Sequence, residues 1–183
     1  MSGALSAPDA PATAGAAPRG LDRLAEAFAV LGIDAPTVEH EAAFTVDDAR
    51  TLRGTIPGLH TKNLFLKDKK GRLFLVTAPE DAAIDLKQIH HAIGAKGRVS
   101  FASGEVLTEV LGILPGSVTP LALINDDAGR VTFVLHHAFR EAELVNVHPL
   151  RNTATTTLAL ADFYAFLRHI GREPDIREIP APA

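Results

Sequence analysis

The chain contains no cysteine. It therefore cannot form a disulfide, use a thiol nucleophile or build a zinc site that includes cysteine. It also has no apolar run approaching the ~18 residues that are needed to cross a bilayer, so we expect no membrane partner. The lack of cysteine fits a reducing compartment, and we expect a cytoplasmic protein.

A surplus of basic residues is also missing, since the formal net charge is −4. Proteins that bind nucleic acid usually carry such a surplus, which displaces counterions from phosphates. If this protein contacts RNA, we expect a local basic patch to make the contact. Composition alone favours an enzyme that acts on a small molecule.

Most catalytic motifs are absent as well. The chain has no phosphate-binding P-loop, no dinucleotide fingerprint and no His-Glu-x-x-His. Ser117 follows a glycine, but the Gly-x-Ser-x-Gly elbow of serine hydrolases is missing. We interpret the pairs His90-His91 and His136-His137 as surface or half-buried histidines, because neighbours on a helix diverge. Asp126 and Asp127 are interpreted as solvated turn residues.

The 183 residues fit one domain. Residues 1–18 are mostly Ala, Pro, Gly and Ser, which predicts a disordered tail without features of a signal or transit peptide. Residues 19–177 are expected to form the folded domain, and residues 178–183 a short C-terminal tail.

Helices and strands alternate along this domain. Helices are predicted over residues 21–31, after Thr45, over residues 85–94, from Ser103 through 111 and over residues 160–170. Strands are predicted over residues 37–40, 63–67, 72–77, around Val99, and over 121–124, 131–135, 144–147 and 155–158. Residues 68–71 join two strands into a hairpin. This pattern predicts a single α+β domain with a mixed, mostly antiparallel sheet and surrounding helices.

Three segments carry a resemblance to a known family. They are Phe44-Thr45-Val46 followed by Thr61-Lys62-Asn63-Leu64-Phe65-Leu66, then Gly116-Ser117-Val118-Thr119-Pro120-Leu121, and then residues 147–158, Val-His-Pro-Leu-Arg-Asn-Thr-Ala-Thr-Thr-Thr-Leu. In order and spacing they resemble the YbaK family, which has the fold of the prolyl-tRNA synthetase editing domain. Within it they look most like the stand-alone ProX (PrdX) branch, which deacylates Ala-tRNA(Pro). The resemblance covers residues 21–176.

The resemblance implies a substrate pocket between the sheet and the loop that ends at Pro120. It implies hydrolysis by a positioned water, helped by loop backbone groups and by the terminal ribose hydroxyl of the tRNA. No metal, other cofactor or covalent intermediate is implied. The implied partner is the acceptor end of tRNA(Pro) carrying a wrong amino acid, with prolyl-tRNA synthetase as a further candidate.

The residues matched to the family's catalytic positions are Lys62, Gly116 and His148. Lys62 would supply a fixed positive charge that orients the ester, although a solvated lysine at a strand's start is the simpler reading. Gly116 would let the loop backbone approach the substrate closely. His148, held extended by the following proline, would shape the pocket or engage the substrate.

Further residues are matched to the substrate pocket. They are Phe44, Thr45, Asn63, Ser117, Val118, Thr119, Pro120 and Thr155. Strand alternation predicts that Asn63 points away from Lys62. Seven basic residues are candidates for steering the acceptor stem, namely Lys67, Lys69, Lys70, Arg72, Lys87, Lys96 and Arg98, although hairpin lysines are usually just solvated.

Three alternatives stay open at this point. The substrate could be another mischarged tRNA, such as Cys-tRNA(Pro). The protein could be a binding module that holds aminoacyl-tRNA or a synthetase without hydrolysis. It could also be a small-molecule enzyme that uses the same fold, which the acidic net charge favours.

Overall fold

The computed structural model describes residues 17–42, 51 and 54–183. The strands are β1 (Thr37–Glu39), β2 (Leu59–Lys67), β3 (Leu73–Pro79), β4 (Ser100–Phe101), β5 (Val131–His136), β6 (Leu144–Val147), β7 (Ala154–Ala159) and β8 (Ile176–Arg177). The helices are α1 (Leu21–Leu31), α3 (Ile89–Ile93), α4 (Gly104–Leu111), α5 (Leu160–His169) and the 3-10 helices η1 (Pro120–Asn125) and η2 (His137–Glu141).

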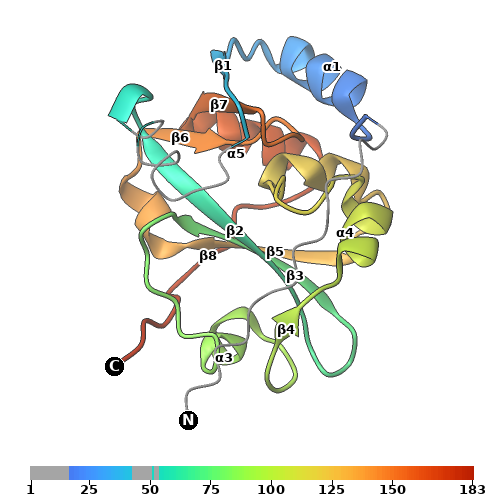
Figure 1. The fold of residues 1–183 in the computed structure, drawn as a ribbon, viewed down its shortest axis with the longest axis vertical. Coiled ribbons are helices and arrows are strands. Elements are labelled where there is room, and N and C mark those ends of the chain that lie inside the picture. The colour runs from blue at the N-terminus through green and yellow to red at the C-terminus, as the bar shows by residue number, and fades with distance from the viewer. Residues whose placement is uncertain (1–16, 43–50, 52–53) are drawn as a thin grey trace.

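These strands form one mixed sheet in the order β1-β7-β6-β2-β3-β5-β8, with β4 paired to β2 outside this path. The pairs of β2 with β3, β2 with β4, β1 with β7 and β6 with β7 are antiparallel. The pairs of β2 with β6, β3 with β5 and β5 with β8 are parallel. Helices surround the sheet (Figure 1), so the predicted α+β class with a mixed sheet is confirmed.

The sheet separates two hydrophobic clusters. The larger cluster packs α1, α4, η1 and α5 against strand residues such as Phe65, Leu75 and Phe133. The smaller cluster packs α3 and Ile179 against Leu66 and other strand residues of the opposite face. Neighbouring residues of a strand point to opposite faces, so odd-numbered residues of β2 face the larger cluster and even-numbered ones the smaller.

Local sequence signals explain the helix ends. α1 ends at Gly32, whose φ of 66° lets its N–H bond the Ala29 carbonyl at 3.2 Å. The predicted cap at Ser103 is confirmed, because its hydroxyl accepts a hydrogen bond from the Val106 N–H at 3.3 Å. α3 ends at Gly94 as predicted but begins only at Ile89.

The predicted hairpin is confirmed by the register that pairs Lys67 with Leu73 and Asn63 with Thr77. β2 nevertheless begins four residues before the predicted start, at Leu59. The added residues include His60 and Lys62, whose polar side chains hide the strand from a search for apolar alternation.

Residues 121–124 were expected to form a strand, and this expectation is wrong. They lie in η1, where all six residues are buried. The Thr119 hydroxyl accepts a hydrogen bond from the Leu121 N–H at 3.3 Å, and Pro120 occupies the first helical position. A short apolar run fits a buried helical turn as well as a buried strand, so periodicity alone does not separate them.

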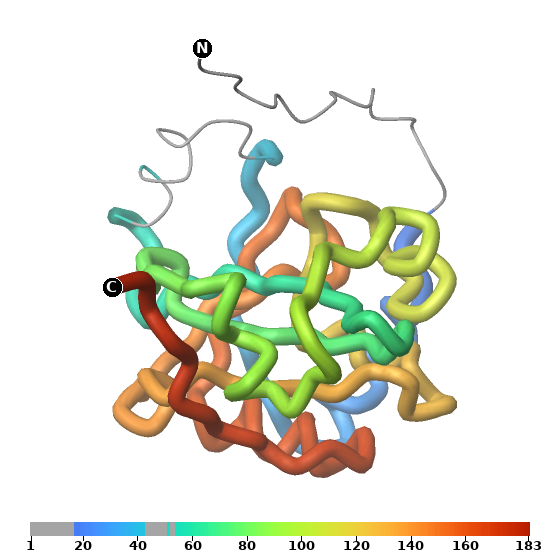
Figure 2. Tube along the Cα trace, turned by 90° about the horizontal axis from the view of Figure 1, so that it is seen from below, coloured from blue at the N-terminus to red at the C-terminus, as the bar shows by residue number. Residues whose placement is uncertain are grey.

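The C-terminal residues pack against the domain. β8, which the sequence did not predict, pairs with the end of β5. Ile179 lies in the segment expected to be a tail, yet it is buried in the smaller cluster. The Asp85 N–H bonds the Pro180 carbonyl at 2.8 Å. Figure 2 shows this red C-terminal segment beside the green segment that holds α3. None of the described helices is long and apolar enough to cross a membrane.

Candidate active site

One edge of β2 has two different strand partners. β3 occupies the opposite edge from Thr61 to Lys67. β6 pairs with Leu59 and His60, and β4 pairs with Leu66 and Lys67. Between these two pairings, residues 61–65 meet no strand on this edge within the described part of the chain. Lys62 and Asn63 therefore lie in an opening of the sheet.

Three candidate residues point to the same face of this part of the sheet. His60 pairs with Asn146 as the last parallel pair of β2 and β6, and Lys62 and His148 each lie two residues further along, beyond the paired residues. Val147 pairs with Thr156, which places His148 level with Thr155. Alternate residues of a strand point to the same face, so Lys62, His148 and Thr155 all point to the face of the smaller cluster.

Lys62 is half-buried, and its ammonium group donates a hydrogen bond to the carbonyl of Ala82. Ala82 lies three residues beyond the end of β3, so the bond directs the amine toward the segment that follows that strand. The pKa of His136 on β5 is lowered, mainly because the ring is buried. The nearby charges of His137 and Lys62 lower this pKa further, whereas the charge of Glu178 raises it. The positive charge of Lys62 is thus felt on the same face two strands away.

His148 is held by a hydrogen bond between Nδ1 and the Ala154 carbonyl at 3.0 Å. A carbonyl only accepts, so Nδ1 carries the proton and Nε2 keeps a lone pair when the ring is neutral. Burial lowers the pKa of His148; the Ala154 carbonyl and Glu80 oppose this shift, and His40 adds to it. At neutral pH the ring is therefore a neutral acceptor of known tautomer.

Thr155 contacts a histidine from a neighbouring segment. The His40 Nε2 lies 2.8 Å from the Thr155 hydroxyl, and its Nδ1 lies 2.8 Å from the Glu41 carbonyl. His40 also acts electrostatically on His148. The sequence analysis did not single out His40, and its distance of 115 residues from Thr155 explains why.

Asn63 points to the opposite face from Lys62, as strand alternation predicted. Its Nδ2 donates to the Val118 carbonyl at 3.0 Å, and its Oδ1 accepts from the Thr77 hydroxyl at 2.6 Å. Thr77 is fully buried and fixes the orientation of the Asn63 amide. Asn63 therefore fastens the loop of residues 116–120 to the open part of β2.

The loop has a defined shape. Gly116 has a φ of 87°, which disfavours any side chain, and a Cβ there would stand 3.5 Å from Asn152. Ser117 is buried, and its N–H bonds the Leu114 carbonyl at 3.1 Å. The hydroxyl of Thr119 and the ring of Pro120 begin η1. The loop thus lies between Asn63 on β2 and the segment that follows His148.

That following segment makes a sharp bend. Leu150 has a φ of 66°, an unusual value for a residue with a side chain, and it is buried in the larger cluster. Arg151 forms an ion pair with Glu39 on β1 through both guanidinium nitrogens. Burial and this ion pair hold the bend beside the loop.

A buried amide lies one row further along the sheet. Asn146 donates to the Pro57 carbonyl at 3.1 Å and accepts from the Thr157 hydroxyl at 2.6 Å. Its own carbonyl accepts from the Thr61 hydroxyl at 2.7 Å. These bonds fasten β2 to β6 just before the opening. The sequence analysis missed Asn146, since a single asparagine within an apolar strand gives no local signal.

Two predicted pocket residues, Phe44 and Thr45, lie outside the described residues. Within residues 17–42, 51 and 54–183, no group of three or more His, Asp or Glu side chains is placed to hold a metal ion. The structure directs Lys62, His148 and Thr155 to the same face of the sheet. It brings Asn63, Gly116 and Val118 together at the loop.

A comparison with known protein families identifies the family of this chain. The model of the aminoacyl-tRNA editing domain matches residues 40–166, which include both groups of residues. This chain belongs to that family.

Relatives of this editing domain occur in animals and bacteria. The bovine (Bos taurus) prolyl-tRNA synthetase associated domain-containing protein 1 is 40% identical over 157 residues, covering 84% of this chain and 91% of its own. The prolyl-tRNA editing protein ProX of Acetoanaerobium sticklandii is 33% identical over 142 residues, covering 77% and 86%. The predicted family resemblance is thereby confirmed.

The fold of this editing domain also occurs among solved structures. One of them, described as a candidate trans-editing enzyme for prolyl tRNA synthetase, matches with a TM-score of 0.64 at 18% identity. The match covers 90% of this chain and all of that one. At this identity the likeness concerns the fold alone.

Proposed function

We propose that this protein is a trans-acting deacylase that hydrolyses the ester of alanine mischarged on tRNA(Pro). Support comes from membership of the editing-domain family, and from a relative that is named a prolyl-tRNA editing protein. The observation that carries the proposal is that Lys62, His148 and Thr155 point to one face at the open part of β2, where Asn63 on the opposite face holds the loop of residues 116–120.

These groups suit attack of water on an ester. The Nε2 of neutral His148 accepts a hydrogen bond from water or substrate, since its Nδ1–H is held by Ala154. The Lys62 ammonium stabilises negative charge as it develops on the carbonyl oxygen. An aminoacyl ester is already activated, so positioning and charge stabilisation are sufficient without a covalent intermediate.

The need for such an enzyme follows from the limits of recognition. A pocket built for proline excludes larger amino acids but rejects the smaller alanine weakly, because missing apolar atoms cost only ~1–3 kcal/mol. A second site that admits alanine and excludes proline restores fidelity. We therefore propose that this domain cleaves Ala-tRNA(Pro) and spares Pro-tRNA(Pro).

The experiment incubates the purified protein with radiolabelled Ala-tRNA(Pro), Pro-tRNA(Pro) and Cys-tRNA(Pro). Wild type is compared with Lys62→Ala and with the control Arg168→Ala, which removes an exposed cation on α5, away from the candidate site. We expect loss of the alanyl ester alone, a fall of about 100- to 1000-fold in kcat/KM for Lys62→Ala, and no change for the control. Equal cleavage of the alanyl and prolyl esters would refute the size selection.

The same assay separates the alternatives. Preferential loss of the cysteinyl ester would identify Cys-tRNA(Pro) as the substrate. Binding of all three tRNAs without release of amino acid would assign a binding module. Parallel reactions in EDTA test the prediction that no metal takes part: activity is expected to persist, and loss with recovery on adding a divalent metal would contradict it.

A further inference from the structure

Two loops meet at the end of β2 that lies away from β6. The turn of residues 68–72 joins β2 to β3, and residues 94–98 lead from α3 toward β4 (Figure 1). The buried carboxylate of Asp68 links them. It accepts hydrogen bonds from the Lys70 N–H at 2.9 Å, the Arg72 N–H at 3.0 Å and Nε at 2.8 Å, and the Lys96 N–H at 2.9 Å.

This linkage gathers positive charge. Residues 66–72 and 94–101 contain six cationic side chains and one carboxylate, that of Asp68. The Asp68 carboxylate is already paired with Arg72 at 2.8 Å. The Lys69 side chain crosses the second loop, since its Cδ lies 3.2 Å from where a Cβ on Gly97 would stand. The remaining exposed cations are Lys67, Lys69, Lys70, Lys96 and Arg98.

Within the described part of the chain, these five cations are free of ion pairs. None of them takes part in an ion pair with any other described residue. Phe101 on β4 lies in the same region with 58% of its surface exposed, and it is paired with Leu66 beside Lys67. Exposed cations beside an exposed aromatic ring are the combination that binds the phosphates and bases of a nucleic-acid strand.

We propose that this basic hairpin surface, made of Lys67, Lys69, Lys70, Lys96, Arg98 and Phe101, binds the phosphate backbone of the tRNA acceptor arm. The proposal rests on the proposed function, because it takes the tRNA end to lie in the site at Lys62. We infer this occupant from charge complementarity, because the surface is strongly positive in a chain whose overall net charge is −4.

The distance along β2 fits this occupant. Five residues separate Lys62 from Lys67, which corresponds to roughly 17 Å in an extended strand. A strand stacked at about 3.4 Å per nucleotide covers that length in about five nucleotides. An ester at Lys62 thus places the first phosphates of the acceptor stem at the basic hairpin surface.

Binding is tested with an uncharged, fluorescently labelled acceptor-stem RNA hairpin, so that the result does not depend on hydrolysis. Lys69→Ala/Lys70→Ala is compared with the control Arg130→Ala/Arg168→Ala, which removes two exposed cations elsewhere. We expect the first variant to bind about tenfold more weakly at low salt and to lose about 1 to 2 units of salt slope. The control should match wild type.

The outcomes separate this surface from the proposed function. If Lys69→Ala/Lys70→Ala binds the RNA with the affinity and salt slope of the wild type, the proposed role of the basic hairpin surface is refuted. This holds even if the protein hydrolyses its ester. RNA binding that depends on these lysines in a protein without deacylase activity would support the surface and refute the proposed function. If the variant instead loses binding to phosphatidylserine vesicles and keeps RNA binding, the surface serves a membrane and the proposal fails. In an active enzyme, KM should rise with kcat unchanged.

Discussion

Two turns of this protein share one five-residue pattern and use it differently. Residues 68–72 read Asp-Lys-Lys-Gly-Arg, and residues 126–130 read Asp-Asp-Ala-Gly-Arg. In both, a buried aspartate accepts hydrogen bonds from backbone N–H groups four residues on, and the glycine N–H bonds the aspartate carbonyl. Both glycines have a positive φ, of 76° and 66°. The backbone design is therefore the same.

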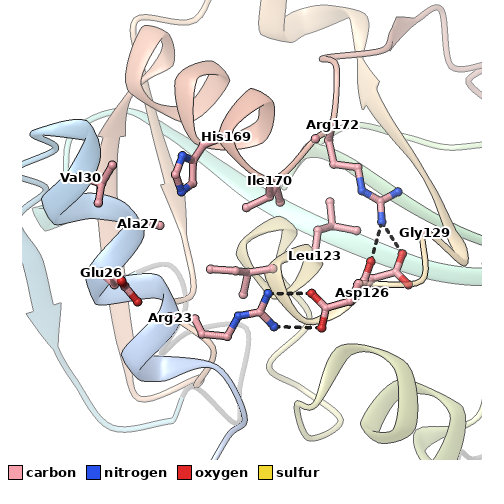
Figure 3. Close-up of a pocket in the computed structure, with 13 residues that line it drawn as sticks. Arg23, Glu26, Ala27, Val30, Leu123, Asp126, Gly129, His169, Ile170 and Arg172 are labelled. Carbon is pink, nitrogen blue, oxygen red and sulfur yellow. Dashed lines mark hydrogen bonds and ion pairs between the residues drawn. The ribbon is translucent and has the colours of Figure 1, made fainter.

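The surroundings of the second turn neutralise its charges. It lines a cavity of about 620 Å³ between α1 and α5 (Figure 3). There Arg23 pairs with Asp127 at 2.7 Å, and Arg172 pairs with Asp126 at 2.5 Å. Around the first turn, the five exposed cations of the basic hairpin surface form no ion pair with any residue that the structure describes. The net charge of the chain consequently says little about either region. The charged side chains of the second turn form ion pairs, whereas those around the first turn are exposed to solvent.

The largest effect is expected for Asp126→Ala. Its side chain is 1% exposed and that of its partner Arg172 only 17%, so the change leaves a buried cation and two backbone N–H groups unpaired. We expect a loss of about 3–5 kcal/mol in the free energy of unfolding, measured by urea denaturation. Asp68→Ala should lose less, because Arg72 is 46% exposed and water can solvate it. An equal loss in both variants would contradict this difference.

The two turns differ in sequence only at their second and third positions. Giving the first turn the residues of the second at these positions tests whether charge alone accounts for the difference in RNA binding. Lys69→Asp/Lys70→Ala gives the first turn the sequence of the second. We expect a fall of about 10- to 100-fold in RNA affinity, because two phosphate partners are lost and one repulsive charge is added. The urea midpoint should stay at the wild-type value, since the shared pattern is kept. A large drop in the midpoint would show that the turns are not equivalent.

The pH dependence of stability should report on Asp68. Burial opposes its ionisation, but hydrogen bonds from Lys96, Arg72 and Lys70 outweigh burial and hold the pKa of its carboxyl below the ordinary 3.8. The stabilisation is therefore complete above about pH 4 and is lost as pH falls below it toward the folded pKa. Thermal melts between pH 2 and 7 should show a shallower acid loss for Asp68→Asn. Parallel curves for both proteins would refute the assignment.

The smallest effect is expected for Arg23→Ala. Its pair with Asp127 is exposed, with side chains 49% and 74% accessible, and exposed pairs contribute little. We expect a urea midpoint within error of wild type and unchanged RNA binding. A clear destabilisation would mean that the charges of this cavity are coupled more strongly than their exposure implies.

The sequence predicted well what local chemistry determines. The hairpin around Asp68, the Ser103 cap, the end of α1 at Gly32 and the opposite directions of Lys62 and Asn63 follow from neighbouring residues. The apolar run at residues 121–124 was misassigned, because burial hides periodicity. Asp126 was interpreted as a solvated turn residue, but it is buried. The sequence did not reveal this because its ion-pair partner, Arg172, lies 46 residues away.

The site was predictable only in part, for the same reason. Lys62, His148 and Thr155 were candidates through family resemblance. Their placement on one face depends on a parallel pairing of β2 with β6 that joins residues about 86 positions apart. His40, Thr77 and Asn146 act through partners distant in sequence, so no local pattern marked them.

The bend at Leu150 links the candidate site to the interior of the protein. A left-handed backbone at a residue with a side chain costs on the order of 1–3 kcal/mol, and burial of the leucine in the larger cluster must offset it. A substitution that reduces packing in that cluster therefore also destabilises the conformation of the segment that follows His148. For the proposed deacylase, turnover would then fall in variants whose substitutions lie in the core and contact no substrate, so the core would constrain activity as much as the site does.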